Sequence, residues 1–330
     1  MGSNKATLNQ SEIGAGIREA EIERLVQNLN SLQEGESAVG TLIAYGQAAI
    51  PTLRRFLLEG RPGVVYQPRR WAVEALAGIG ARSVLIEYLK QKRSIADAAV
   101  RFGEEPVENA AARALAARWQ DEDTFQTLLE MSRRRAQVGF VEALARFRRA
   151  EAIPYFLHSL EDDICRSSAE EALRAVGPTA IPALVESALT RLPSTEEERP
   201  SSARRRAGIL ELLSEMDLTQ QTWQSLGPLI DDSHGGVVIA ASKIAARMGD
   251  RQERMAAACR LLEVLPSADW YAAEEIGDCL KNLYDDAREI LEAELTRRDS
   301  LPDAQRVMDR ALRTLLRVKR LARAARGREL

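Results

Sequence analysis

The side chains that most often perform acid–base, nucleophilic or metal chemistry are few in this sequence and lie far apart. The two histidines are His158 and His234, and the three cysteines are Cys165, Cys259 and Cys279, with no C-x-x-C among them. Metal centres need several such ligands at short spacing, and nucleophilic catalysis needs a base beside the nucleophile. The sequence therefore predicts no metal site, no cofactor and no catalytic residue, which favours a protein that is not an enzyme.

Motifs that cradle phosphate groups or expose a catalytic serine are not found either. The chain contains neither G-x-x-x-x-G-K-[ST] nor G-x-S-x-G. The paired acids Asp162-Asp163 and Asp231-Asp232 are interpreted as helix caps, because an aspartate side chain accepts hydrogen bonds from the first backbone N–H groups of a helix.

Arginine shows the most distinctive pattern. The chain has 40 Arg against 6 Lys, although its net charge is only −3. Residues 133–149 alone hold six Arg and one acid, Glu142. Such a group favours an acidic protein segment or a phosphate backbone as partner, unless its arginines pair with nearby acids such as Glu161. The candidate residues are Arg133, Arg134, Arg135, Arg146, Arg148, Arg149, Arg166, Arg174, Arg204, Arg205 and Arg206.

A second basic feature closes the chain. Residues 306–330 hold nine basic and two acidic residues, a balance of +7, which leaves −10 for residues 1–305. Basic residues recur every three or four positions opposite an apolar face, which predicts a basic amphipathic helix. It would dock on an acidic partner, nucleic acid or anionic lipid, or it would be the polar outer face of a terminal helix. The stripe consists of Arg306, Arg310, Arg313, Arg317 and Arg320.

The elements that position these residues follow from an internal repeat. An Ile-Pro pair recurs at Ile50-Pro51, Ile153-Pro154 and Ile181-Pro182, and an apolar position recurs every 29 to 39 residues from Leu42 to Leu312. Each unit holds two stretches with apolar residues at i, i+3, i+4 and i+7, which is helical spacing. Proline begins the first helix and glycine ends the second. One such pair cannot bury its apolar face alone, so neighbouring pairs must stack.

The sequence Gly-x-x-Ala-Ile-Pro-x-Leu, followed by Arg-x-x-Ala-x-x-Ala-Leu-x-x-x-Gly, resembles the short bacterial HEAT-like repeat, the type named after phycobilisome lyases. Arg70, Arg166 and Arg205 match the arginine near the start of its second helix. The resemblance implies an all-α, right-handed α-solenoid (α-α superhelix) of about nine stacked antiparallel helix pairs. It implies a fold rather than a function, because this repeat serves scaffolds, adaptors and a few enzymes.

The repeat also sets the expected organisation of the chain. Residues 1–16 are expected to be disordered, and residues 17–315 to form a single solenoid. Within it, 17–45 would be the N-terminal cap, 46–250 the clear repeats, and 251–315 the degenerate repeats and C-terminal cap. Residues 316–330 would be the end of the basic helix or a tail.

Enlarged connections between the two helices of a unit are expected at residues 60–68, 91–106 and 191–200. Because all three fall at the same point of the unit, they should emerge on one edge, where solenoids often bind partners. The alternative is that they are tolerated surface insertions. The candidate contacts on this edge are Tyr66, Arg69, Arg70, Arg93 and Arg101. The second helices of such a solenoid usually line its concave face, so the central arginines are expected there.

Three functions are consistent with these features. The first is a non-catalytic scaffold or adaptor that binds another protein, acidic or extended, through its concave face and enlarged loops. The second is nucleic-acid binding by the concave arginines, in the manner of HEAT-like DNA glycosylases that grip backbone phosphates. The third, a bilin lyase or isomerase subunit, is suggested only by the name of the repeat.

The compartment is predicted from cysteine usage and hydropathy. Three unpaired, widely spaced cysteines are typical of a reducing cytoplasm. No stretch approaches the roughly 18 uninterrupted apolar residues of a membrane span. A cytoplasmic protein is therefore expected, and the sequence leaves its oligomeric state open.

Overall fold

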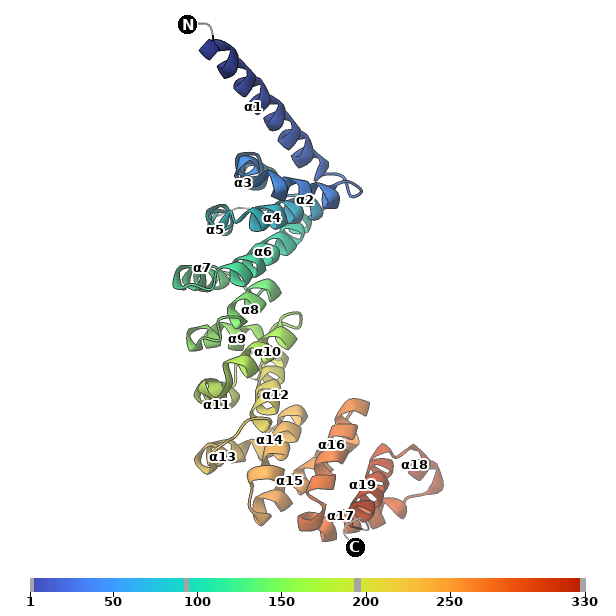
Figure 1. The fold of residues 1–330 in the computed structure, drawn as a ribbon. Helices are drawn as coiled ribbons and strands as arrows, with labels where there is room; N and C mark the ends of the chain where they lie inside the picture. The colour runs from blue at the N-terminus through green and yellow to red at the C-terminus, as the bar shows by residue number, and fades with distance from the viewer. Residues whose placement is uncertain (1–2, 92–94, 193–196, 327–330) are drawn as a thin grey trace. The chain divides into compact units, whose positions relative to one another are not determined.

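A computed structural model of the chain describes residues 3–91, 95–192 and 197–326. Helices with short connections make up this part of the chain, and it contains no β-strand (Figure 1). No helix within it is long and apolar enough to cross a membrane. The all-helical class expected from the repeat is confirmed.

The chain forms two compact units, Met1–Tyr155 and Phe156–Leu330, whose boundary falls inside helix α9 (Ile153–Ser159). Each unit is built from helix pairs of the expected kind. That one continuous solenoid spans both units stays a prediction.

The N-terminal unit consists of two layers of helices. Its even-numbered helices pack one on the next, α2 on α4, α4 on α6 and α6 on α8, while α1, α3, α5 and α7 form the second row (Figure 1). The helices are α1 (Ser3–Asn28), α2 (Gly35–Tyr45), α3 (Ile50–Leu58), α4 (Gln67–Ile79), α5 (Arg82–Lys90), α6 (Ala98–Arg118), α7 (Glu122–Ser132) and α8 (Val138–Ala145), with the 3₁₀ turns η1 (Gly46–Ala49) and η2 (Ala150–Ala152).

The repeat motif sets the helix boundaries as expected. Pro51 lies in the first turn of α3, where its lack of an N–H costs no hydrogen bond. Gly46 follows α2 and Gly80 follows α4, and both have positive φ, which glycine adopts without strain. Ala72 and Ala111 are fully buried, so small side chains let α4 and α6 approach closely.

The start of the first helix differs from the expectation. The sequence places it at Ile17, after a disordered segment, whereas α1 already begins at Ser3. No proline interrupts the residues between these positions, which include Ala6, Leu8 and Glu12 among the good helix formers. The helix continues toward the N-terminus beyond its apolar positions, of which Ile22, Leu25 and Val26 are buried.

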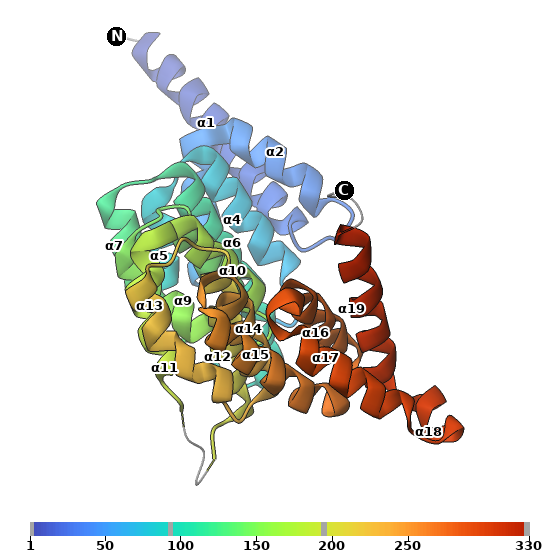
Figure 2. The ribbon, with the colours of Figure 1, turned by 90° about the horizontal axis from the view of Figure 1, so that it is seen from below.

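The C-terminal unit repeats the two-row packing. Helix α12 packs on α10 and α14, and α16 packs on α14 and α19; Figure 2 shows α16 and α19 side by side. The helices are α10 (Arg166–Val176), α11 (Ile181–Leu189), α12 (Pro200–Ser214), α13 (Gln220–Leu226), α14 (Gly235–Met248), α15 (Arg251–Val264), α16 (Trp270–Asn282), α17 (Tyr284–Asp299), α18 (Asp303–Met308) and α19 (Arg310–Arg326), with η3 (Gly177–Ala180), η4 (Gly227–Asp231) and η5 (Leu265–Ser267).

Helix pairs also form after residue 250, where the motif fades and only periodicity indicated them. Helix α15 packs on α16, and α17 packs on α19. Pro302 lies in the break between two helices, since α17 ends at Asp299 and α18 begins at Asp303.

Close packing between α6 and α8 gives the first testable prediction. A β-carbon on Gly139 would lie 2.7 Å from the carbonyl oxygen of Asn109, a backbone atom that cannot rotate away. We expect Gly139→Ala to lower the free energy of unfolding by about 1–3 kcal/mol, the usual cost of overpacking. Gly40, on α2, has open space around it, so Gly40→Ala should instead raise this free energy by about 0.5–1 kcal/mol. Urea denaturation of both variants checks this, and equal effects would contradict the packing described.

Buried Cys279 on α16 gives a prediction for alkaline pH. Burial raises the pKa of its thiol from 9.0 to about 12. Between these values the unfolded chain loses the proton and the folded chain keeps it, so stability falls as the pH rises through this window. We expect the wild type to lose up to about 4 kcal/mol of unfolding free energy across the window through this group, and Cys279→Ala to lose correspondingly less. Denaturant unfolding at pH 8 and pH 10.5 tests this, and identical losses in both proteins would refute it.

Candidate interaction surfaces

The first enlarged connection packs on helix α6. A β-carbon on Gly103, in α6, would lie 2.5 Å from the carbonyl oxygen of Gly63 and 2.9 Å from that of Val64. The α3–α4 connection therefore lies directly against the N-terminal half of α6. A common edge for all three connections stays a prediction, since residues 191–200 fall in the other unit.

The second connection is shorter than expected. Residues 98–106 belong to α6 and do not form a separate short helix or loop, and Pro106 lies inside α6. Asp97 caps this helix by accepting hydrogen bonds from the N–H groups of Ala99 and Val100. Because a helix can begin at such a cap, α6 continues through the region that the repeat pattern assigns to a loop.

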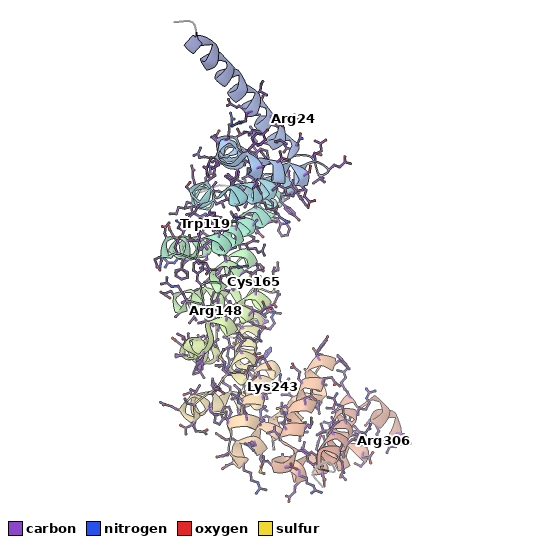
Figure 3. The ribbon with its side chains drawn as sticks, in the orientation of Figure 1. Arg24, Trp119, Arg148, Cys165, Lys243 and Arg306 are labelled. Carbon is purple, nitrogen blue, oxygen red and sulfur yellow. The ribbon has the colours of Figure 1, made fainter. Side chains whose placement is uncertain are left out.

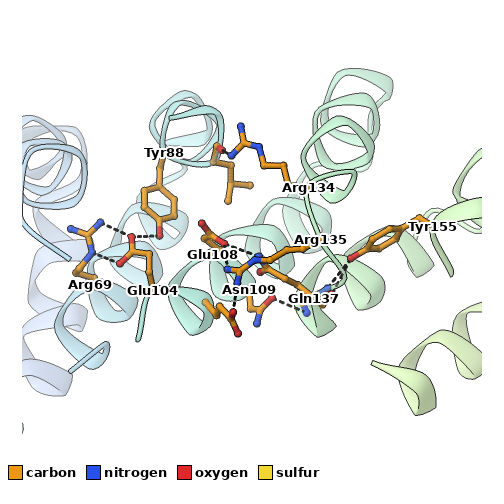
Figure 4. A network of polar contacts seen from close by, with 12 residues as sticks. Arg69, Tyr88, Glu104, Glu108, Asn109, Arg134, Arg135, Gln137 and Tyr155 are labelled. Carbon is orange, nitrogen blue, oxygen red and sulfur yellow. Dashed lines mark hydrogen bonds and ion pairs between the residues drawn. The ribbon is translucent and has the colours of Figure 1, made fainter. Parts of the chain in front are cut away.

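A buried ion pair holds the α3–α4 connection in place (Figure 4). Arg69 donates to the Glu104 carboxylate from Nε at 3.0 Å and from Nη2 at 2.8 Å. It also donates to the carbonyl oxygens of Leu57 at 2.9 Å and Gly60 at 3.2 Å. The Tyr88 hydroxyl donates to Glu104 at 2.7 Å, and burial together with this carboxylate raises the pKa of Tyr88 well above its usual value.

The next turn of α6 fixes the α7–α8 connection in the same way (Figure 4). Arg135 pairs with Glu105 and, at 3.2 Å, with Glu108. The Gln137 amide donates to Glu108 at 2.8 Å, and its backbone N–H donates to the Tyr155 hydroxyl at 3.0 Å. These contacts and the network around Arg69 make α6 the common base of both connections.

A cavity of about 340 Å³ opens among these groups. Its polar lining combines Arg101, Arg134 and Arg135 with Glu104 and Glu108. Charges of both signs line it, and Arg135 and both glutamates already have partners of opposite charge, so it is not built as an anion site.

Three large apolar side chains are exposed where the α3–α4 connection meets α6. Val64 is 61% exposed, Val65 58% and Phe102 70%. Phe102 precedes Gly103, which faces the backbone of Val64, so Phe102 and the two valines lie on neighbouring segments. These three residues are called the edge patch. The repeat pattern does not indicate these residues, because it carries no information on the exposure of side chains between helices. The only signal was an apolar Val-Val pair inside a Gly- and Pro-rich connection.

The central arginines do not form a single patch on a second helix. Arg133, Arg134 and Arg135 precede α8, whereas Arg146, Arg148 and Arg149 follow it. The eight residues of α8 separate the two groups by about 12 Å of helix. The expectation that these six arginines lie on a second helix is therefore wrong, because they lie before and after α8.

Some of these arginines bind carbonyl oxygens or carboxylates of neighbouring helices and turns. Arg134 donates to the carbonyl oxygen of Leu89 at 3.2 Å, at the end of α5. Arg149 pairs with Glu122 and Glu151, and its guanidinium lies 4.1 Å from the ring centre of Phe125. Of the six arginines between residues 133 and 149, three are exposed and have no ion pair with any residue that the structure describes: Arg133, Arg146 and Arg148. Figure 3 shows the position of Arg148.

The candidates of the C-terminal unit are mostly paired as well. Arg166 pairs with Asp163 at 2.5 Å, and Arg174 pairs with Glu215 at 2.7 Å. Arg204 is exposed, and the carboxylate of Asp163 lies 3.8 Å from its guanidinium.

The prediction that Arg205 and Arg206 contact a partner is wrong, because both side chains are buried. Arg205 donates to the carbonyl oxygen of Thr190 at 2.7 Å. Arg206 has no exposed surface and binds Glu198 and Asp232, each at 2.7 Å. Their sequence spacing on α12 turns them inward, while Arg204 stays on the surface.

The loop candidates also divide by burial. The prediction that Arg69 contacts a partner is also wrong, because its side chain is buried in the ion pair with Glu104. Arg70 is exposed and pairs with Glu74 at 2.9 Å, Tyr66 is half-buried and Arg101 is exposed. Arg93 lies outside the described residues.

The C-terminal stripe lies on two helices instead of one. Arg306 lies on α18, where it pairs with Asp303 at 2.7 Å (Figure 3). Asp309 interrupts the helix, since its carboxylate caps α19 through the N–H of Leu312 and pairs with Arg298. The remaining four stripe residues, Arg310, Arg313, Arg317 and Arg320, follow on α19.

Comparisons with known proteins found no matching protein family and no matching curated protein. Among solved structures, human deoxyhypusine hydroxylase in complex with glycerol is 17% identical, with 83% of this chain and 99% of that chain covered and a TM-score of 0.31. An engineered protein is 20% identical, with 89% and 78% covered and a TM-score of 0.28. Likenesses this weak indicate neither a family nor a function. The helical-repeat architecture is evident from the stacked helix pairs of this chain.

Proposed function

We propose that this protein is a non-catalytic scaffold or adaptor that binds another protein through the connection edge of its N-terminal unit. The edge patch of Val64, Val65 and Phe102 carries the proposal. Exposed apolar groups that lie together favour a protein partner, because covering them removes apolar surface from water.

The base beneath the edge patch supports this function. Arg69, Glu104 and Tyr88 hold the α3–α4 connection on α6 through buried hydrogen bonds. A surface that is already ordered loses little conformational entropy when a partner binds. The edge is therefore suited to recognition without rearrangement.

The arginines weigh against a phosphate backbone as the main partner. Nucleic-acid binding depends on basic side chains free to neutralise phosphates. Here Arg134, Arg135 and Arg149 are engaged by carbonyl oxygens or carboxylates, and Arg205 and Arg206 are buried.

The proposal keeps the finer features that the repeat resemblance implies. These are a right-handed superhelix of about nine helix pairs, of the bacterial phycobilisome-lyase type. The few, widely spaced histidines and cysteines add the expectation that the protein is not an enzyme. A cytoplasmic location, which the unpaired cysteines favour, belongs to the same proposal.

Affinity purification from the native host tests the proposed function. The baits are the wild-type chain, the variant Val64→Ser/Val65→Ser/Phe102→Ser, and the control Ile164→Ser, which changes an equally exposed apolar residue of the other unit. We expect the wild type and the control to retain the same proteins. The amount of these proteins that the triple variant retains should be lower by about tenfold or more, which corresponds to a loss of about 1.4 kcal/mol or more of binding free energy. An unchanged set would overturn the proposal. Recovery of nucleic acid that disappears in Arg133→Ala/Arg146→Ala/Arg148→Ala would favour the phosphate-binding alternative.

A further inference from the structure

The C-terminal unit exposes an aromatic pair that the proposed function does not use. Trp270 and Tyr271 form the first turn of α16 and are 61% and 76% exposed. Their rings touch edge to face, with centroids 5.1 Å apart. Aromatics are only 5% of this chain, and Trp223, Phe125 and Phe156 are fully buried.

The neighbouring helix α19 places arginines beside this pair. Arg310 donates to the carbonyl oxygen of Ala268 at 2.7 Å, just before the pair. Arg317 pairs with Glu274, and with Asp278 at 2.9 Å, just after it. The two helices therefore run in the same direction, and Figures 1 and 2 both show them side by side.

The same register locates Arg313. One helical turn before Arg317 on α19 is Arg313, and one turn before Glu274 on α16 is Trp270. The contact between Arg317 and Glu274 thus predicts that Arg313 lies beside Trp270. Arg313 is exposed and forms no ion pair with any residue that the structure describes.

The charges around the pair are unequally compensated. On the side of α16, Glu274 and Asp278 share Arg317, Glu275 pairs with Lys243 at 3.4 Å, and the N-cap Asp269 accepts from the N–H of Ala272. The sequence of α19 contains no acid, and Arg310 binds a carbonyl oxygen. Arg310 and Arg313, the arginines nearest the aromatic pair, therefore have no carboxylate partner among the described residues.

We propose that Trp270, Tyr271 and Arg313 form a second docking site, which binds an acidic protein segment carrying an apolar anchor side chain. The two rings cover the anchor, and Arg313 binds a carboxylate that flanks it. Trp, Tyr and Arg are the residue types that most often dominate binding energy at protein interfaces. The site goes beyond the proposed function, because it lies in the other unit and selects its partner by charge.

A random dodecapeptide library displayed on phage, selected on the full chain, tests the site. We expect enriched peptides in which Asp or Glu flanks Leu, Phe or Trp. The affinity of the best synthetic peptide, measured by fluorescence anisotropy, should fall about tenfold or more with Trp270→Ala and severalfold with Arg313→Ala. It should also weaken as salt is raised, because the charges are exposed.

Controls separate this site from the edge patch. Ile164→Ala and Arg204→Ala change similarly exposed residues elsewhere in the same unit and should leave peptide affinity unchanged. The variant Val64→Ser/Val65→Ser/Phe102→Ser should also bind the peptide normally, even if it loses the partner of the edge patch. No enrichment, enrichment without acidic residues, or equal binding by Trp270→Ala would overturn the inference. Competition by a single-stranded dT12 oligonucleotide that depends on Trp270 and Arg313 would overturn it in favour of nucleic acid.

Discussion

Arg206→Met is expected to lower the free energy of unfolding by about 3–5 kcal/mol, the usual result of breaking a buried ion pair. The Arg206 side chain has no exposed surface, and it binds the carboxylates of Glu198 and Asp232 and the carbonyl oxygen of Ala188, each at 2.7 Å. Methionine fills much of the same volume but leaves the buried Asp232 carboxylate without its fully buried guanidinium partner. Urea denaturation monitored by circular dichroism measures the loss.

Arg204→Met is the matched control for this prediction. Arg204 lies two residues earlier on α12, is half exposed, and has its nearest carboxylate at 3.8 Å. We expect its replacement to change stability by less than about 1 kcal/mol, as is usual for exposed ion pairs. Similar losses for both variants would show that the pairing of Arg206 does not stabilise the unit.

The pH dependence of this effect follows from Asp232. Burial alone would raise the pKa of its carboxyl, but hydrogen bonds from Arg206, from the N–H of His234 and from Arg191 hold the pKa below 3.8. The contribution of the pair is therefore present above about pH 4 and is lost as the pH falls through the folded-state pKa. The difference between wild type and Arg206→Met should be large at pH 7 and shrink in acid. A difference that stays constant down to pH 3 would contradict this assignment.

Arg69→Met is expected to cost a similar amount, about 3–5 kcal/mol of unfolding free energy. The variant removes the guanidinium that faces the buried Glu104 carboxylate, and it also releases the carbonyl oxygens of Leu57 and Gly60. Amide hydrogen exchange in the α3–α4 connection should therefore accelerate along with the loss of stability.

Two comparisons make this second prediction specific. Arg70→Met changes the adjacent arginine, which is exposed and pairs only within its own helix with Glu74, so about 0.5 kcal/mol or less is expected. The double variant Arg69→Met/Glu104→Gln should be less destabilised than the sum of the two single variants, because the buried charge leaves together with its partner. Additive losses would indicate that the two side chains do not interact.

These neighbouring pairs show why the sequence could not identify the binding residues. Arg69 and Arg70, like Arg204 and Arg206, are the same residue type one or two positions apart, and only their direction relative to the core separates them. The repeat pattern placed Arg70 and Arg205 at equivalent positions, yet Arg70 is exposed and Arg205 is buried. The outcome depends on which carbonyl oxygens and carboxylates the adjacent connections bring within reach.

A similar reason explains why the six arginines of residues 133–149 do not all present free positive charge. Its excess of positive charge is a property of the sequence, whereas a basic surface is a property of three-dimensional neighbours. Arg135 meets Glu105 and Glu108, which lie about 30 positions earlier, one repeat away. In a stacked repeat, acids of the preceding unit neutralise arginines of the next, so a local charge balance does not predict the surface.

The sequence by itself determined the helical class, the presence of helix pairs and those helix boundaries that the repeat motif marks. Proline, glycine and the apolar periodicity act within one or two turns of the chain, so Pro51, Gly46 and Gly80 lie where the motif predicts. Only the tertiary structure decided which side chains are free to bind. Exposure of Val64, Phe102 and Trp270, and burial of Arg69 and Arg206, depend on contacts between helices that are distant in sequence, and no local pattern encodes them.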